Sequence, residues 1–305
     1  MTLVDPGAST AIGGEPQPGS GADDLGEARP LRADIWKRFR RNHLAMAGLI
    51  FLILLVLAAI FAPLIAPYGI SERSTSFRAS PSSAHWFGTD TIGRDVFSRV
   101  VYGARVSLKI GFVATFLSVA IGVILGAISG FFGGWSDTLI TRVIDIFLAI
   151  PYIVLAVAIA SVFGHSENSV ILVLGLTGWL ALARIVRSSF LSLKNMEYTE
   201  AATALGFSRS RVMARHILPN ALQPIIVYGT ISVGAVILAE AALSFLNVGP
   251  QDPTPAWGLM VSEAKGSLTD APHMLFFPGA AIFLTVLAFV FIGDGLRDAL
   301  DPKLK

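Results

Sequence analysis

Long apolar stretches alternate with short polar connections along most of this chain. A helix needs about 20 predominantly apolar residues to cross about 30 Å of hydrocarbon, and six stretches approach that length. They are Leu44–Ala66, Ser107–Phe131, Leu139–Phe163, Val170–Phe190, Ala221–Val248 and Leu275–Leu296. The pattern predicts an all-α polytopic membrane protein with six transmembrane helices, which places both termini on the same side.

The polar segments divide the rest of the chain. Residues 1–30 are rich in Gly, Pro, Ser and Asp, which is typical of a disordered tail. Residues 31–43 form a basic amphipathic segment, residues 44–66 the first transmembrane helix and residues 67–106 an external segment. Residues 107–305 form a core of five transmembrane helices, with a cytoplasmic loop at 191–220 and an external loop at 249–274.

The orientation follows from lysines and arginines near the span ends, which favour the cytoplasmic side. The segment before the first span, the loop after the fourth span and the C-terminal tail are all basic. Their residues are Arg32, Lys37, Arg38, Arg40, Arg41, Lys194, Arg209, Arg211, Arg215, Arg297, Lys303 and Lys305. Both termini and the loop after the fourth span are therefore predicted to be cytoplasmic. The external segment contradicts the rule, because it contains Arg73, Arg78, Arg94 and Arg99.

Composition supports the membrane interpretation. The 305 residues are 53% hydrophobic and 14% charged, too apolar for an ordinary soluble domain. The formal net charge is +2, and the basic residues adjoin apolar runs, so lipid headgroups suit them better than nucleic acid. The absence of cysteine excludes disulfides and thiolate chemistry.

Small residues recur every four positions in the second span, at Gly122, Gly126, Gly130 and Gly134. This spacing places them on one face, where another helix can approach closely. We interpret the stripe as a helix-packing surface.

Charged residues inside spans are costly and are functional candidates. Glu240, with Ser244 one turn later, could face a translocation path, or it could pair with a hydroxyl or backbone group between helices. Asp145 lies three residues from Arg142 and is expected to form a local ion pair. Asp294 and Arg297 are expected to anchor the end of the sixth span in the same way.

Neither a metal site nor a catalytic residue is predicted. His85 and Asp90 have no second His or Cys nearby at a ligand spacing. The segment around Gly88 is instead interpreted as a turn before an external helix that lies across the mouth of the protein. No Ser-His-Asp or Cys-His arrangement can be argued from the scattered candidates.

The loop between the fourth and fifth spans predicts two short helices. Asn195 is a plausible N-cap, Glu197 and Glu200 suit the first turn, and Gly206 suits a helix C-terminus. Ser208 would cap a second short helix, and Pro219 fits the first turn of the fifth span. The spacing alone also allows an amphipathic connector that lies on lipid.

Glu200-Ala201-Ala202, Gly206 and Leu218-Pro219 resemble the EAA loop of ABC-importer permeases. His216 stands where the general pattern has Ile, a form associated with the peptide branch. The resemblance implies that this loop couples to an ATPase. The implied residues are Glu197, Tyr198, Thr199, Glu200, Ala201, Ala202, Ala204, Leu205, Gly206, Arg209, His216, Leu218 and Pro219.

Other segments resemble the C-type permease of the dipeptide, oligopeptide and nickel importers. They include His85-Trp86-Phe87-Gly88-Thr89-Asp90, Gly93-Arg94-Asp95-Val96, Glu240-Ala241-Ala242-Leu243-Ser244 and Gly293-Asp294-Gly295-Leu296-Arg297. The resemblance implies the type I importer permease fold in the cytoplasmic membrane. It also implies a homologous second permease, two ATP-binding subunits or one fused ATPase, and an external solute-binding protein.

The chain lacks a G-x-x-x-x-G-K-[ST] phosphate loop, so ATP and Mg²⁺ are expected on the partner subunits. The implied function is alternating-access import of short peptides, with nickel, haem or another small solute as the alternative cargo. An ion-coupled secondary transporter that uses Glu240 and Asp145 is a second alternative, and a structural membrane scaffold is a third.

Overall fold

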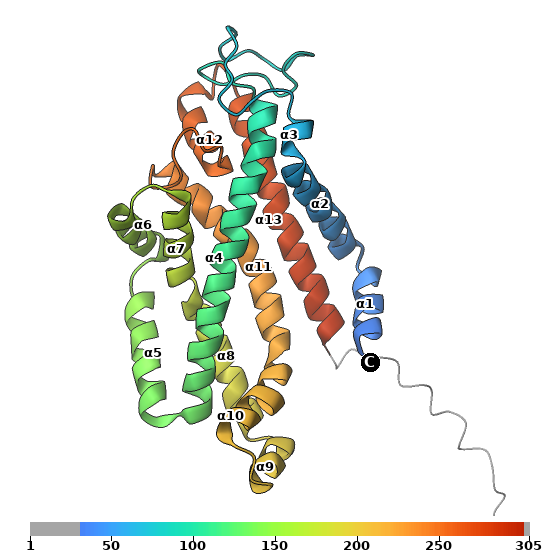
Figure 1. Cartoon of the computed structure of the whole chain (residues 1–305), viewed down its shortest axis with the longest axis vertical. Helices are drawn as coiled ribbons and strands as arrows, with labels where there is room; N and C mark the ends of the chain where they lie inside the picture. The colour runs from blue at the N-terminus through green and yellow to red at the C-terminus, as the bar shows by residue number, and fades with distance from the viewer. Residues whose placement is uncertain (1–30, 302–305) are drawn as a thin grey trace, which may run out of the picture.

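Helices dominate the computed structural model, which describes residues 31–301 (Figure 1). The predicted tail, residues 1–30, and the tail residues Lys303 and Lys305 lie outside the described part. The α-helices are α1 (Leu31–Arg41), α2 (His43–Ile60), α3 (Ala62–Ile65), α4 (Val96–Phe132), α5 (Gly134–Leu148), α6 (Tyr152–Phe163), α7 (Glu167–Thr177), α8 (Trp179–Lys194), α9 (Glu197–Ala204), α10 (Arg209–Val212), α11 (Leu218–Phe245), α12 (Trp257–Glu263) and α13 (His273–Leu300). A π-helical turn, Met213–Ile217, joins α10 to α11, and a 3-10 turn, Ala264–Ser267, follows α12.

Five helical segments are long and apolar enough to span a membrane, and a sixth span exists only if α5 and α6 are counted together. These two helices are bent by 91° relative to each other, so the predicted third span, Leu139–Phe163, is not one continuous helix. Pro151 precedes α6, and a proline disfavours helical geometry at the residue before it. The remaining five predicted spans are confirmed as helices, with shifted ends.

The second span begins earlier than predicted. Asp95 is the N-cap of α4 and accepts a hydrogen bond from the Ser98 N–H at 2.7 Å. The eleven residues before Ser107 are therefore helical, although they contain two arginines. The separate external helix predicted after Gly88 is wrong, because that helix is the first part of α4.

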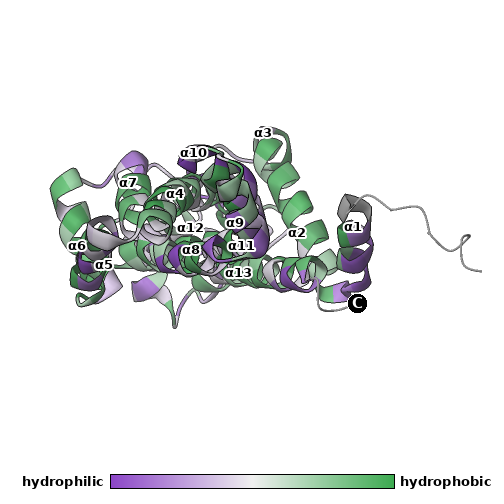
Figure 2. Ribbon diagram, turned by 90° about the horizontal axis from the view of Figure 1, so that it is seen from below, coloured by the Kyte–Doolittle hydropathy of each residue, from purple (hydrophilic) through white to green (hydrophobic). Residues whose placement is uncertain are grey.

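The basic segments gather at one end of the molecule. In Figure 1, α1, the end of α13 and the α9–α10 region lie at one end, and α12 and residues 67–95 lie at the other. Arg38 Nη1 donates to the Asp301 carbonyl oxygen at 3.1 Å, which ties α1 to the C-terminal end of α13. Figure 2 shows hydrophilic residues on α1 and around α9, whereas α2, α3 and α6 are largely hydrophobic.

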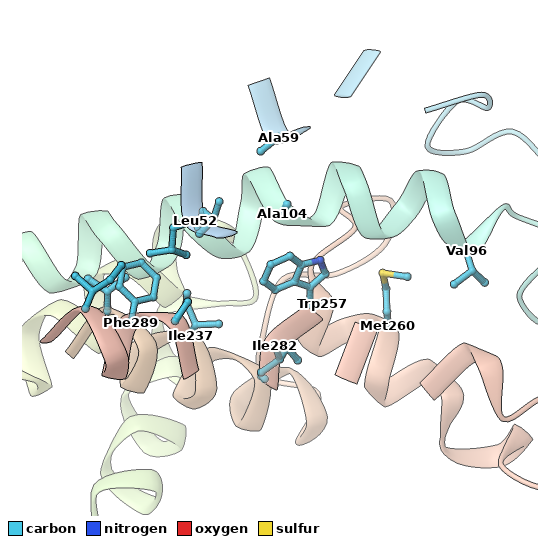
Figure 3. Close-up of a cluster of buried hydrophobic side chains, with 14 of the residues drawn as sticks. Leu52, Ala59, Val96, Ala104, Ile237, Trp257, Met260, Ile282 and Phe289 are labelled. Atoms are coloured by element: carbon cyan, nitrogen blue, oxygen red, sulfur yellow. The ribbon is translucent and has the colours of Figure 1, made fainter. Parts of the chain in front are cut away.

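The largest apolar cluster joins elements that are far apart in the sequence. It contains Leu52 from α2, Ala104 from α4, Ile237 from α11, Trp257 from α12 and Phe289 from α13 (Figure 3). Trp257 is fully buried, and its indole N–H donates to the Val100 carbonyl at 2.9 Å. The short helix α12 is thereby fixed inside the bundle.

Three of the four predicted packing glycines contact α8. A Cβ at Gly126 would lie 2.6 Å from the Ala183 carbonyl oxygen, and one at Gly130 would lie 2.7 Å from that of Arg187. Gly122 approaches the same helix. Gly134 does not, because it begins α5 with a φ of 56° and no atom lies within 4 Å of its Cβ position.

Charged side chains between helices form ion pairs with residues on other helices and not with their neighbours in the sequence. Asp145 pairs with Arg184 of α8 at 2.6 Å, so the predicted local pair with Arg142 is wrong. Among the residues that the structure describes, no ion pair joins Asp294 to Arg297, and both side chains are exposed.

Candidate functional site

The predicted coupling loop forms a short helix, α9, at the end of the molecule that carries the basic segments. The predicted N-cap Asn195 is instead the C-cap of α8, and Met196 is the N-cap of α9 without a side-chain hydrogen bond. Two residues, Asn195 and Met196, separate α8 from α9, and the Met196 carbonyl accepts a hydrogen bond from the Thr199 N–H at 2.8 Å. The Thr199 hydroxyl donates to the Leu193 carbonyl at 2.9 Å and fastens α9 to α8.

Gly206 ends α9 as predicted. Its φ is 79°, its N–H donates to the Thr203 carbonyl at 3.0 Å, and the Phe207 N–H donates to the Ala202 carbonyl at 3.2 Å. These two bonds form a Schellman motif, which favours glycine at the left-handed position.

The second predicted short helix is not separate. From Arg209 the chain remains helical through α10 and the π-helical turn into α11, and Pro219 lies in the first turn of α11. Ser208 precedes α10 in extended geometry, but its side chain makes no capping bond. The ring of His216 stacks on Phe207 with 5.8 Å between ring centroids, so the residue after Gly206 is held against the start of α11.

α9 presents apolar side chains to solvent while its inner face is buried. Leu205 is 76% exposed and Tyr198 is 41% exposed, whereas Thr199 and Ala202 are buried. Other implied coupling residues are also exposed: Glu197, Glu200, Ala201, Ala204, Arg209 and Pro219. His216 and Leu218 are partly buried at the base of the loop. Large exposed apolar residues on a short polar loop are typical of a protein interface.

A groove of about 660 Å³ separates α9 from the end of α4. Phe131 and Phe132 line one side, and Glu200 and Arg209 line the other. The groove therefore offers both apolar and charged groups beside the exposed face of α9.

Glu240 lies in the packed interior near the other end of the molecule. It is 0% exposed, the Ser244 hydroxyl donates to its Oε1 at 2.7 Å, and the Ser107 hydroxyl lies 3.5 Å from its Oε2. Ser107 Oγ also accepts a hydrogen bond from the backbone N–H of Trp257 at 3.2 Å. These contacts match the alternative in which Glu240 pairs with hydroxyls between helices.

Sequence reasoning missed a charge cluster with two buried arginines that joins residues 90–99 to the segment after α11. We define the cluster as Asp90, Arg94, Arg99, Asp252 and Glu263. Arg94 Nε lies 2.5 Å from Asp90 Oδ2, Arg99 Nη1 lies 2.7 Å from both Asp90 and Glu263, and Arg94 also pairs with Asp252. The excess of arginine in the external segment was the one available signal.

The cluster accounts for two of the four arginines by which this segment contradicts the charge rule, Arg94 and Arg99, whereas Arg73 and Arg78 are exposed. Its two guanidinium groups are neutralised by three carboxylates and are nearly buried, so they do not act as free positive charge. Burial raises the pKa of Asp90, but hydrogen bonds and positive charge from Arg94, together with the charge of Arg99, outweigh it and hold this pKa below its ordinary value.

The structure gives no support to a metal site around His85. Its Nδ1 bonds Asp95 at 2.9 Å, beside the N-terminus of α4. No group of three or more His, Cys, Asp or Glu side chains suited to a metal occurs within residues 31–301.

Two family patterns match the sequence. The family described as "Binding-protein-dependent transport system inner membrane component" matches residues 122–305. The "N-terminal TM domain of oligopeptide transport permease C" matches residues 31–81.

Two named relatives match nearly the whole chain. The chain is 46% identical over 274 residues to the "Glutathione transport system permease protein GsiD" of Shigella sonnei, with 89% of this chain and 90% of that protein covered. It is 44% identical over 292 residues to the "Dipeptide transport system permease protein DppC" of Alkalihalophilus pseudofirmus, with 95% and 96% covered.

Solved structures support the fold. The inward-facing MetNI methionine ABC transporter matches with a TM-score of 0.56 at 20% identity, covering 67% of this chain and 97% of that chain. An amino acid ABC transporter matches with a TM-score of 0.52 at 16% identity, covering 66% and 94%. The chain therefore belongs to the inner-membrane components of binding-protein-dependent transport systems, and it is a permease subunit of an ABC importer.

Proposed function

We propose that this chain is the C-type permease of an importer for short peptides, with both termini and α9 in the cytoplasm. The relatives named for dipeptide and for glutathione, itself a tripeptide, support this substrate class. The gathering of Lys37, Arg38, Arg209 and Arg211 at the end that holds α9 supports the orientation.

In this proposal the chain performs no catalysis. One homologous permease and two ATP-binding subunits, or one fused ATPase, complete the membrane complex, and a binding protein delivers the peptide from outside. ATP and Mg²⁺ bind to the ATPase subunits. Their closure displaces α9, and the permeases alternate between outward-facing and inward-facing states.

One observation carries the coupling role: α9 exposes Leu205 and Tyr198 but is fastened to the helices on both sides. Thr199 bonds the end of α8, and Phe207 stacks on His216 at the start of α11. A partner that grips the exposed face of α9 can therefore move both helices. A helix that merely rested on lipid would not need these two attachments.

The role of Glu240 and Ser244 in lining the translocation path remains a prediction. Their contacts lie between α4, α11 and α12, so they reach a solute only in a state that separates α4 from α11.

The experiment is reconstitution of the complete transporter in proteoliposomes, with uptake of labelled trialanine and ATP hydrolysis measured together. Glu200→Lys and Leu205→Asp should lower uptake at least about tenfold, because interface anchors contribute about 2 kcal/mol or more. Asp270→Lys is the matched control, since Asp270 is exposed at the opposite end.

Two outcomes would contradict the proposal separately. A wild-type transporter that hydrolyses ATP but does not move trialanine would refute the peptide assignment. Normal uptake by folded Glu200→Lys and Leu205→Asp variants would refute the coupling role of α9.

A further inference from the structure

A cavity of about 200 Å³ lies in the bundle where the third predicted span is interrupted. The interruption is the 91° bend between α5 and α6, and Gly178, at the junction of α7 and α8, lines the same cavity. Side chains from α4 and α11 complete the wall. Interrupted helices at membrane depth are a recurrent setting for solute sites in transporters.

The cavity is lined by hydroxyl groups and apolar side chains without any charged residue. The hydroxyl-bearing residues are Thr115, Ser118, Tyr152, Thr177, Tyr228 and Ser232. Two of these hydroxyls have protein acceptors: Ser118 Oγ lies 3.0 Å from the Gly175 carbonyl, and Thr177 Oγ1 lies 2.7 Å from that of Val173. Their oxygens keep lone pairs that can accept a hydrogen bond.

Thr115 provides the second observation. Its side chain lines the cavity, the residue is only 5% exposed, and its Oγ1 is buried without a hydrogen-bond partner among residues 31–301. Buried polar groups are almost always hydrogen-bonded, so an unpaired hydroxyl that faces a cavity indicates a missing partner. The partner must be able to donate to, or accept from, a neutral hydroxyl.

One side of the cavity is open. Tyr152 is 37% exposed, and Ala181 and Ala235 are also exposed. The volume is below the about 300–1,000 Å³ that is usual for a complete ligand site. An open cavity of this size can form one wall of a larger site that a second subunit completes.

We propose that this cavity is the half of the translocation site that holds the main chain of the transported peptide. The inference rests on the proposed peptide import. Main-chain amides are neutral and offer one donor and one acceptor per residue, whatever the side chain, which suits a wall of hydroxyls. A wall without charge also imposes no electrostatic selection on the peptide's side chains. In this site the Thr115 Oγ1 accepts a hydrogen bond from a peptide N–H, and Tyr152 and Tyr228 line the same cavity.

The test compares two substrates in the reconstituted transporter: trialanine and an analogue in which one of its two amides is replaced by an ester, made in turn at each position, which removes one N–H donor. The measured quantity is the ratio of the two uptake rates. Because every variant uses the same binding protein, the preference of that protein cancels when variants are compared with wild type.

Thr115→Val keeps the shape of the side chain and removes the hydroxyl. Loss of one neutral hydrogen bond corresponds to an about 3- to 10-fold change, so the amide-over-ester ratio should fall by about that factor in the variant. Thr115→Ser should retain most of the wild-type ratio. Thr285→Val is the matched control, because Thr285 is a buried threonine of α13 that lies outside the cavity.

A ratio unchanged by Thr115→Val would overturn the proposal while leaving peptide import intact. Failure of wild type to transport trialanine would instead refute the proposed function itself. If Thr115→Val does not assemble, Ser232→Ala is read in the same way, because Ser232 is only partly buried on the same wall. A ratio unchanged by Ser232→Ala in that case would equally overturn the proposal.

Discussion

Arg99→Met should destabilise the protein strongly, because Arg99 is the central cation of the external charge cluster. Its side chain is 1% exposed, and its Nη1 lies 2.7 Å from carboxylate oxygens of both Asp90 and Glu263. Without it, three carboxylates face one guanidinium group. Removing one partner of a buried ion pair costs about 3–5 kcal/mol.

Two features of the cluster move the expected cost toward the lower end of that range. Asp90 keeps Arg94 as a partner, and methionine removes two buried guanidinium nitrogens, Nε and Nη2, that lack hydrogen-bond partners in the part of the chain that the structure describes. We therefore expect a loss of about 3 kcal/mol, which corresponds to a fall in Tm of about 6–12 °C at about 2–4 °C per kcal/mol.

The assay is thermal unfolding of the detergent-solubilised chain, followed by tryptophan fluorescence. Arg73→Met is the matched control, because Arg73 is exposed in the same external segment and should change stability by less than about 0.5 kcal/mol. The double variant Arg99→Met with Glu263→Gln should recover part of the loss, because it removes a carboxylate left unpaired. Equal shifts for Arg99→Met and Arg73→Met would show that the cluster does not stabilise the external end.

Three further predictions concern packing, pH and an ion pair between α5 and α8. Gly126→Ala should destabilise the protein by about 1–3 kcal/mol through overpacking, because the new Cβ would lie 2.6 Å from a backbone oxygen of α8. Gly279→Ala, whose Cβ would have no atom within 4 Å, should stabilise α13 by about 0.5–1 kcal/mol. Melting curves that rank the two variants in the opposite order would contradict this packing. The pKa of Asp90 is lowered in the folded state, so the contribution of Asp90 to stability is present above the unfolded pKa of about 3.9 and is lost as the pH falls below that value. The stability difference between wild type and Asp90→Asn should therefore shrink below about pH 4. A difference that is constant from about pH 6 to about pH 3 would exclude this linkage. Asp137→Asn breaks a partly exposed ion pair with Arg187 of α8, and we expect it to destabilise the protein by about 1 kcal/mol. A variant whose Tm equals that of wild type would contradict this expectation.

The sequence was sufficient for the approximate place of five spans, because an apolar run of about 20 residues leaves few other structures possible, but it gave no sign of the 91° bend within the third. The sequence was insufficient for the first residue of the second span. The hydropathy pattern placed the start at Ser107, but the N-cap Asp95 begins the helix at Val96. Asp95 is a favourable N-cap residue, but the arginines that follow it lower the hydropathy of residues 96–106, so the hydropathy pattern did not include them in the helix.

Partner choice was the second failure, and its physical reason is different. Asp145 pairs with Arg184 and not with Arg142, and Arg94 and Arg99 find Asp252 and Glu263 more than 150 residues away. Local spacing predicts only pairs on one helix, whereas tertiary packing decides which helices meet. The α9 loop was better predicted, because Gly206 needs a left-handed conformation that follows from local backbone geometry alone.

The proposed coupling element and the proposed peptide cavity are joined by two continuous helices. α8 runs from Leu182 at the cavity to Lys194 beside α9, about 18 Å at 1.5 Å per residue, and α11 runs from Leu218 to Tyr228, about 15 Å. Gly122, Gly126 and Gly130 hold α8 against α4 without intervening side chains, so α8 can tilt only together with α4 or by sliding along it. A displacement of α9 therefore moves three of the helices that line the cavity. For this reason Gly126→Ala should impair uptake as well as stability, whereas Gly279→Ala, on a helix that does not line the cavity, should leave uptake unchanged.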